Sequence, residues 1–157
     1  MINPLENYEE WTLEVVGKKL LGINGLIYIL EDPDFDHPQQ LQLVFSKTGI
    51  ADSLKCGKDG STLELTDHPM QEKDLGEYGK EIIIDISHIN PFVKFIGKTL
   101  SKVFLIFSSA EDAYVGLRLN FEDNFSLFIM NIGDEINIFE CLPKSFEQNE
   151  GITYSEL

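Results

Sequence analysis

The chain has 157 residues, with 27 acidic against 12 basic side chains, a formal net charge of −15 and an isoelectric point near 4.4. Hydrophobic residues make up 43% of it, which argues against a disordered chain and predicts a single globular domain over residues 1–157. The acidic excess argues against nucleic acid and membrane surfaces as partners, because both present phosphate groups, and it favours a basic protein partner.

The sequence predicts a cytoplasmic protein. No apolar run approaches the roughly 20 residues that a membrane helix needs. The first four residues lack the basic and apolar regions of a secretion signal. The two cysteines, Cys56 and Cys141, have no CxxC spacing, so we expect reduced, buried thiols and neither a redox motif nor a zinc site.

The first expected element is a short helix from Asn7 to Val16, with acidic residues in its first turn. Little other helix is expected. Apolar residues alternate in Leu41–Phe45 and in Leu117–Phe121, which is the pattern of half-buried antiparallel strands. A further strand is expected at Glu81–Ser87, and the polar tail from Gln148 to Leu157 is expected to fray. The fold class is therefore mainly β.

The chain also contains two similar units. The motif G-K-x-L occurs at residues 17–20 and 97–100, and an apolar run, an alternating strand and polar turns follow each copy in the same order. We therefore predict an internal repeat over residues 11–66 and 91–140, joined by a polar connection over residues 67–90. Each unit would form an antiparallel β-meander, and the two similar meanders would share one core.

The second G-K-x-L copy has the ending of a phosphate-binding P-loop, G-K-[ST]. The glycine that such a loop needs five residues before Gly97 is replaced by Phe92, and the residues after Lys98 are typical of a strand instead of a helix. We interpret Gly97 as a turn residue and Lys98 as a surface charge. No nucleotide and no other cofactor is predicted.

The densest acidic stretch has partial similarity to a calcium loop. Asp32, Asp34 and Asp36 have the 1-3-5 spacing of an EF-hand, but His37 stands where glycine is needed and Leu43 where glutamate is needed. We expect an acidic hairpin loop here and no metal site, although the same loop could also contact a basic protein.

The sequence shows no local signature of catalysis. Its three histidines, His37, His68 and His88, lie in unrelated segments without the spacing of a metal site. No serine or cysteine lies in a recognisable nucleophile motif. We therefore predict no catalytic residues and no enzyme.

The second unit carries a resemblance to a type of protein. G-K-x-L, an apolar strand, L-x-L-x-F-E-D and N-x-G-D-E-I-x-I follow one another between Ile96 and Ile138. This order resembles small acidic bacterial immunity and immunity-like proteins, which antagonise secreted toxins. The first unit departs from it, with a longer acidic loop. The resemblance implies a non-catalytic inhibitor that occludes a basic partner such as a toxin domain, and it assigns no individual functional residues.

We predict an acidic partner-binding surface formed by eight residues of the two units: Glu31, Asp32, Asp34, Asp36, Glu122, Asp123, Asp134 and Glu135. Two other functions stay open. One is a small-ligand-binding or enzymatic domain, in which histidine, cysteine and carboxylate side chains converge in a cleft between the units. The other is a structural or regulatory domain that forms a homodimer through an exposed edge strand such as Glu81–Ser87.

Overall fold

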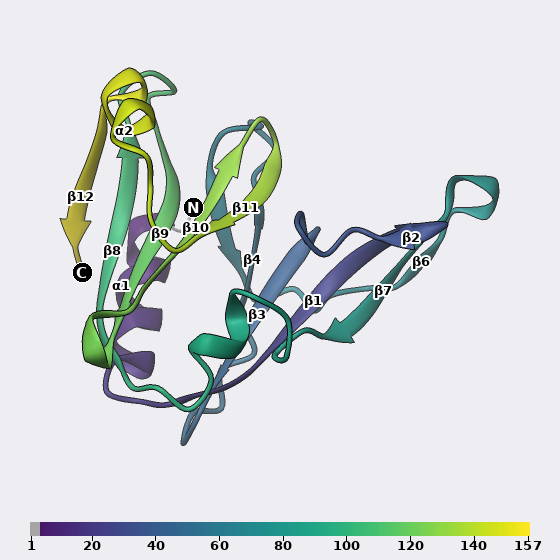
Figure 1. Cartoon of the computed structure of the whole chain (residues 1–157), viewed down its shortest axis with the longest axis horizontal. Helices are drawn as coiled ribbons and strands as arrows, with labels where there is room; N and C mark the ends of the chain where they lie inside the picture. The colour runs from purple at the N-terminus through teal and green to yellow at the C-terminus, as the bar shows by residue number, and fades with distance from the viewer. Residues whose placement is uncertain (1–3) are drawn as a thin grey trace.

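The computed structural model describes residues 4–157, and strands dominate this part of the chain (Figure 1). The two helices and twelve strands of the described residues are α1 (Pro4–Val15), β1 (Leu20–Leu30), β2 (Asp32–Pro33), β3 (Gln40–Phe45), β4 (Ser53–Cys56), β5 (Leu63–Thr66), β6 (Lys73–Asp74), β7 (Lys80–Asp85), β8 (Leu100–Ser108), β9 (Ala113–Phe121), β10 (Ser126–Ile132), β11 (Glu135–Phe139), α2 (Lys144–Glu150) and β12 (Ile152–Glu156). Single 3-10 turns form η1 (Gly76–Tyr78), η2 (Phe92–Lys94) and η3 (Glu122–Asn124).

The strands form two antiparallel sheets with corresponding strand orders. The first sheet runs β5-β4-β3-β1-β7-β6, with β2 paired to the end of β1, and the second runs β11-β10-β9-β8-β12. The first five strands of the first sheet therefore match the whole second sheet in order. This confirms the mainly β fold class with two similar meanders. That the match arises from a repeat in the sequence stays a prediction.

The two sheets meet where the G-K-x-L segments run antiparallel to each other. The N–H of Gly17 donates to the carbonyl of Leu100 at 2.8 Å, and the N–H of Gly97 donates to the carbonyl of Leu20 at 2.7 Å. The two hydrogen bonds are therefore equivalent: in each segment the glycine donates its N–H and the leucine accepts through its carbonyl oxygen. Gly17 and Gly97 have φ angles of 87° and 85°, a left-handed conformation that glycine adopts without strain. Gly97 is a turn residue, as predicted.

One core lies between the two sheets and α1. The helix buries Tyr8, Trp11 and Val15, which are spaced so that they share one face. The strands of both sheets fill the rest, and their most deeply buried members are Leu20, Ile23, Ile27, Leu41, Leu54, Leu63, Leu100, Leu105, Leu117, Leu119, Leu127 and Ile129. A smaller cluster covers the opposite face of the second sheet, where Phe146 of α2 packs against it.

The first sheet extends beyond this core as an arm, which we define as residues 28–36 and 71–85. The end of β1 pairs with β2 and β7, and β6 pairs with the start of β7. Figure 1 shows this end of the sheet projecting at the right of the molecule. Every residue from 71 to 78 is exposed.

Several local predictions were wrong. The tail is not frayed, because β12 pairs with β8 over five residues, from Ile152 opposite Ser108 onward. The alternation of Ile152 and Tyr154 places both side chains against the smaller cluster. The cysteines are free, but Cys141 is exposed and Cys56 is only half-buried.

Candidate functional site

The eight predicted acidic residues lie in three places. The four of the first unit, Glu31, Asp32, Asp34 and Asp36, lie in the arm, at and beyond the end of β1. Glu122 and Asp123 lie in η3 at one end of β10, whereas Asp134, in the turn, and Glu135, the first residue of β11, lie at its other end. A strand of seven residues separates these two pairs, which corresponds to roughly 20 Å. The residues therefore do not form one continuous surface.

Two of these carboxylates are engaged within the fold. Glu122 accepts a hydrogen bond from the N–H of Thr99 at 3.1 Å, and Asp123 lies 3.3 Å from the ammonium nitrogen of Lys98. The same ammonium lies 4.4 Å from the ring centre of Phe125. Lys98 therefore neutralises part of the negative charge at this end of β10. This end of the strand should attract a basic partner less strongly as a result.

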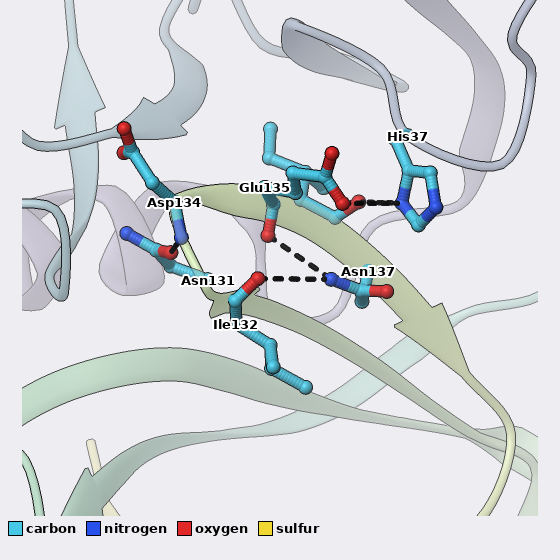
Figure 2. Close-up of polar contacts among 7 residues, drawn as sticks. His37, Asn131, Ile132, Asp134, Glu135 and Asn137 are labelled. Carbon is cyan, nitrogen blue, oxygen red and sulfur yellow. Dashed lines mark hydrogen bonds and ion pairs between the residues drawn. The ribbon is translucent and has the colours of Figure 1, made fainter.

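The first unit does meet the turn between β10 and β11 (Figure 2). His37 Nδ1 lies 3.8 Å from a carboxylate oxygen of Glu135 and 3.2 Å from the carbonyl oxygen of Ile136. The side-chain oxygen of Asn131 holds the turn by accepting the N–H of Asp134 at 3.0 Å. The end of the acidic loop and the second-unit turn thus lie side by side.

This junction also brings together the side-chain types that the enzymatic alternative requires. His37, Cys56, Asp134 and Glu135 line one hollow of about 350 Å³. Burial, and then the negative charges of Asp134 and Glu135, raise the pKa of the Cys56 thiol to about 11. A nucleophilic cysteine needs the opposite shift, because the thiolate is the reactive form. The residues meet, and the raised pKa keeps the Cys56 thiol protonated at neutral pH.

The arm concentrates charge and apolar surface together. It carries nine carboxylates against two lysines, which is nearly half of the net charge of −15. Four large apolar side chains on it are exposed, by 52% for Leu30, 39% for Leu75, 69% for Tyr78 and 42% for Ile83. Direct pairing of Ile83 with Leu26 of β1 places Ile83 on the sheet face opposite the one that packs on the core.

Hydrogen bonds between side chains and the backbone fix the shape of the arm. The hydroxyl of Tyr28 donates to the carbonyl oxygen of Tyr78, which holds η1 over β1. A carboxylate oxygen of Glu72 accepts the N–H of Ile83 at 2.9 Å. That N–H lies on the outer edge of β7, where a further strand would otherwise bind. Glu72 therefore occupies the open part of this edge.

A groove that the sequence did not indicate lies between α1 and β5, with a volume of about 860 Å³. Its apolar side chains are Trp11, Leu13, Ile50 and Leu65, and its carboxylates are Glu10, Glu14, Asp52, Glu64 and Asp67. In the described part of the chain, neither lysine nor arginine lines it. Burial, and then the charge of Asp67, raise the pKa of Asp52, as expected for a carboxyl group that lies near another negative charge. His68 also lines the groove.

The walls of this groove are held rigidly. The hydroxyl of Tyr8 donates to the carbonyl oxygen of Leu63 at 2.5 Å, which attaches α1 to the edge of β5. Trp11 is 3% exposed and packs edge-on against Phe45, with ring centres 6.1 Å apart. Leu13, on the outer side of the same helix, is 84% exposed. The groove thus has a fixed apolar floor, an exposed leucine at its rim and carboxylates around it.

Within residues 4–157, no three His, Cys, Asp or Glu side chains are arranged to hold a metal ion. No helix among these residues is long and apolar enough to cross a bilayer. No protein-family model, curated protein or solved structure matches the chain. Its function must therefore be inferred from its own side chains.

Proposed function

We propose that this chain is a non-catalytic binding protein that antagonises a basic protein, such as a secreted toxin domain, by covering its cationic surface. The observation that carries the proposal is the arm, which combines nine carboxylates with exposed Leu30, Tyr78 and Ile83. Four of the eight predicted partner-binding residues, Glu31, Asp32, Asp34 and Asp36, belong to it. The proposal therefore keeps the predicted chemistry and places it on a projecting element.

The arm combines the two contributions that a tight interface needs. Its carboxylates would steer a basic partner and raise the association rate. Its exposed tyrosine and aliphatic side chains would supply the apolar centre, where most of the binding energy of an interface is concentrated. A nuclease toxin holds its phosphate substrate with cationic side chains, so an acidic arm inserted among them would block the substrate.

The two alternatives receive less support. For an enzyme that uses histidine, cysteine and carboxylates between the units, the cysteine at their junction is Cys56, whose thiol pKa is raised instead of lowered. The dimer alternative relies on the edge of β7, where Glu72 already accepts the N–H of Ile83. A second copy would have to displace that carboxylate and would bring two acidic arms together.

A photocrosslinking group in place of Tyr78 in the full chain tests the proposal in cells that produce it. We expect capture of a basic protein. With that partner purified, neutralising the four carboxylates of residues 31–36 should lower the association rate about tenfold or more at low salt and flatten its salt dependence. The matched control neutralises four exposed carboxylates outside the arm: Glu6, Glu9, Glu111 and Asp112. Equal rates for the two variants would refute the role of the arm.

A further inference from the structure

The groove between α1 and β5 lies outside the arm and is a concave site with buried apolar side chains at its floor and carboxylates around it. We propose that it is a second docking site, which takes a basic amphipathic segment of a partner protein with lysine or arginine side chains next to an apolar one. This inference does not depend on the arm and would hold even if the arm bound nothing.

The charge of the groove identifies the chemistry of its occupant. Five carboxylates and one histidine, His68, line it, and in the described residues no lysine or arginine does. A few exposed carboxylates elsewhere in the fold have a cation beside them, as in the pairs Lys94–Glu140 at 3.0 Å and Lys102–Glu156 at 3.3 Å. The groove therefore presents unbalanced negative charge on two facing walls. A cationic side chain between those walls would gain attraction from both of them.

The apolar side chains identify the occupant as a protein segment instead of a free cation. Leu13 projects from α1 with 84% of its surface exposed, beside the buried Trp11 and Leu65. A metal ion or a polyamine would leave this leucine in water. A segment with lysine or arginine on one side and an aliphatic residue on the other would cover it and face the carboxylates at the same time.

The groove is also preformed, which lowers the entropic cost of binding. The bond from Tyr8 to Leu63 fixes the distance between the two walls, and the contact between Trp11 and Phe45 fixes the floor. Asp52 and Asp67 come from segments on either side of the β4–β5 hairpin, so their mutual approach depends on the fold. A partner would meet these groups already in position.

Trp11 is the only tryptophan of the chain and lines the groove, so its fluorescence reports occupancy directly. The probe is a short amphipathic peptide of lysine and leucine, titrated into the full chain and followed by tryptophan fluorescence and calorimetry. Three comparison probes separate the contributions: a lysine–serine peptide removes the apolar face, a glutamate–leucine peptide reverses the charge, and spermine supplies cations alone. We expect only the lysine–leucine peptide to bind tightly.

Variants then localise the binding. Leu13→Ser should weaken the lysine–leucine peptide about tenfold or more, because an aliphatic contact is lost. Asp52→Asn combined with Asp67→Asn should weaken it about twofold to thirtyfold at low salt and reduce its salt dependence. The matched controls are Leu21→Ser, at a leucine that is 57% exposed outside the groove, and Asp112→Asn. Neither control should change the affinity.

Four results would overturn the inference. Equal affinity in the groove variants and in the controls would mean that the peptide binds elsewhere. Spermine or the lysine–serine peptide binding as tightly as the lysine–leucine peptide would mean a purely electrostatic surface. No binding of the lysine–leucine peptide up to about 1 mM would mean no usable site. If instead only neutralisation of residues 31–36 abolished peptide binding, the arm proposal would stand and the groove inference would fail.

Discussion

The hydroxyl of Tyr8 offers a direct test of how the groove is held together. Tyr8 is 3% exposed, and its hydroxyl is bonded to the carbonyl of Leu63, 55 positions further along the chain. Tyr8→Phe keeps the ring and removes this bond, which leaves a buried carbonyl without its tyrosine donor. Leaving such a group unsatisfied costs about 1–3 kcal/mol. For a chain of this size, each kcal/mol lowers the melting temperature by about 2–4 °C, so we expect a decrease of roughly 2–12 °C.

Urea denaturation followed by Trp11 fluorescence measures this loss, because the tryptophan is buried beside the affected bond. Tyr114→Phe is the matched control, since Tyr114 is 39% exposed and its ring keeps the contact with Phe107. The control should lie within about 0.5 kcal/mol of the unmodified chain. If Tyr8→Phe were as stable as Tyr114→Phe, the bond to Leu63 would not hold α1 in place and the rigid groove would lose its basis.

Three further outcomes follow from single groups. Burial raises the pKa of Cys56 from 9.0 to about 11, and burial followed by the bond to Glu147 raises that of Tyr154 from 10.0 to about 12. Both groups stay protonated to a higher pH in the folded state than in the unfolded state, so the unfolding free energy should fall as pH rises from 9 to 12. In a plot of the urea midpoint against pH, Tyr154→Phe should make the decrease near pH 12 less steep. Iodoacetamide at mildly alkaline pH should label exposed Cys141 before Cys56, as peptide mass spectrometry would detect, and the reverse order would revive the enzymatic alternative. Gly79→Ala should loosen the arm, because the added Cβ would clash with the carbonyl oxygen of Ile29. Limited proteolysis should then cleave residues 71–78 faster than in the unmodified chain. The control Gly76→Ala should raise the cleavage rate less, because its Cβ meets no neighbour within 4 Å.

The strands that alternate clearly could be predicted from the sequence. Leu41–Phe45 and Leu117–Phe121 correspond to β3 and β9 because each buries one face against the core, so the period of two is visible in the residue types. The predicted Glu81–Ser87 strand is β7, which ends at Asp85. In β12 only Ile152 and Tyr154 are apolar, and a tail of polar neighbours conceals a strand that the edge of β8 stabilises.

The groove could not be predicted because its side chains come from three separate segments. Trp11 and Leu13 belong to the helix, Asp52 precedes β4, and Glu64 and Asp67 lie in and after β5. The helix is acidic by itself, with four glutamates among its twelve residues, but no spacing rule connects it with Asp52, Glu64 and Asp67. By contrast, the dense run from residue 31 to 36 was visible in the sequence. Glu122 and Asp123 were equally visible, but each has a partner within the fold, which residue type does not reveal.

The carboxylates of the groove should lower the stability of the free protein, and this separates a binding role from a structural one. The pKa of Asp52 is raised in the folded state from its ordinary value of 3.8. This group therefore stabilises the fold only while it is protonated. The stabilisation is lost as pH rises from 3.8 through the pKa of the folded state. At neutral pH, Asp52→Asn should therefore raise the melting temperature, and added salt should narrow the difference from the unmodified chain by screening Asp67. The same substitution should weaken the lysine–leucine peptide. A variant that gained stability and kept full affinity would mean that the negative charge serves neither folding nor binding, whereas loss of stability would mean that Asp52 supports the fold.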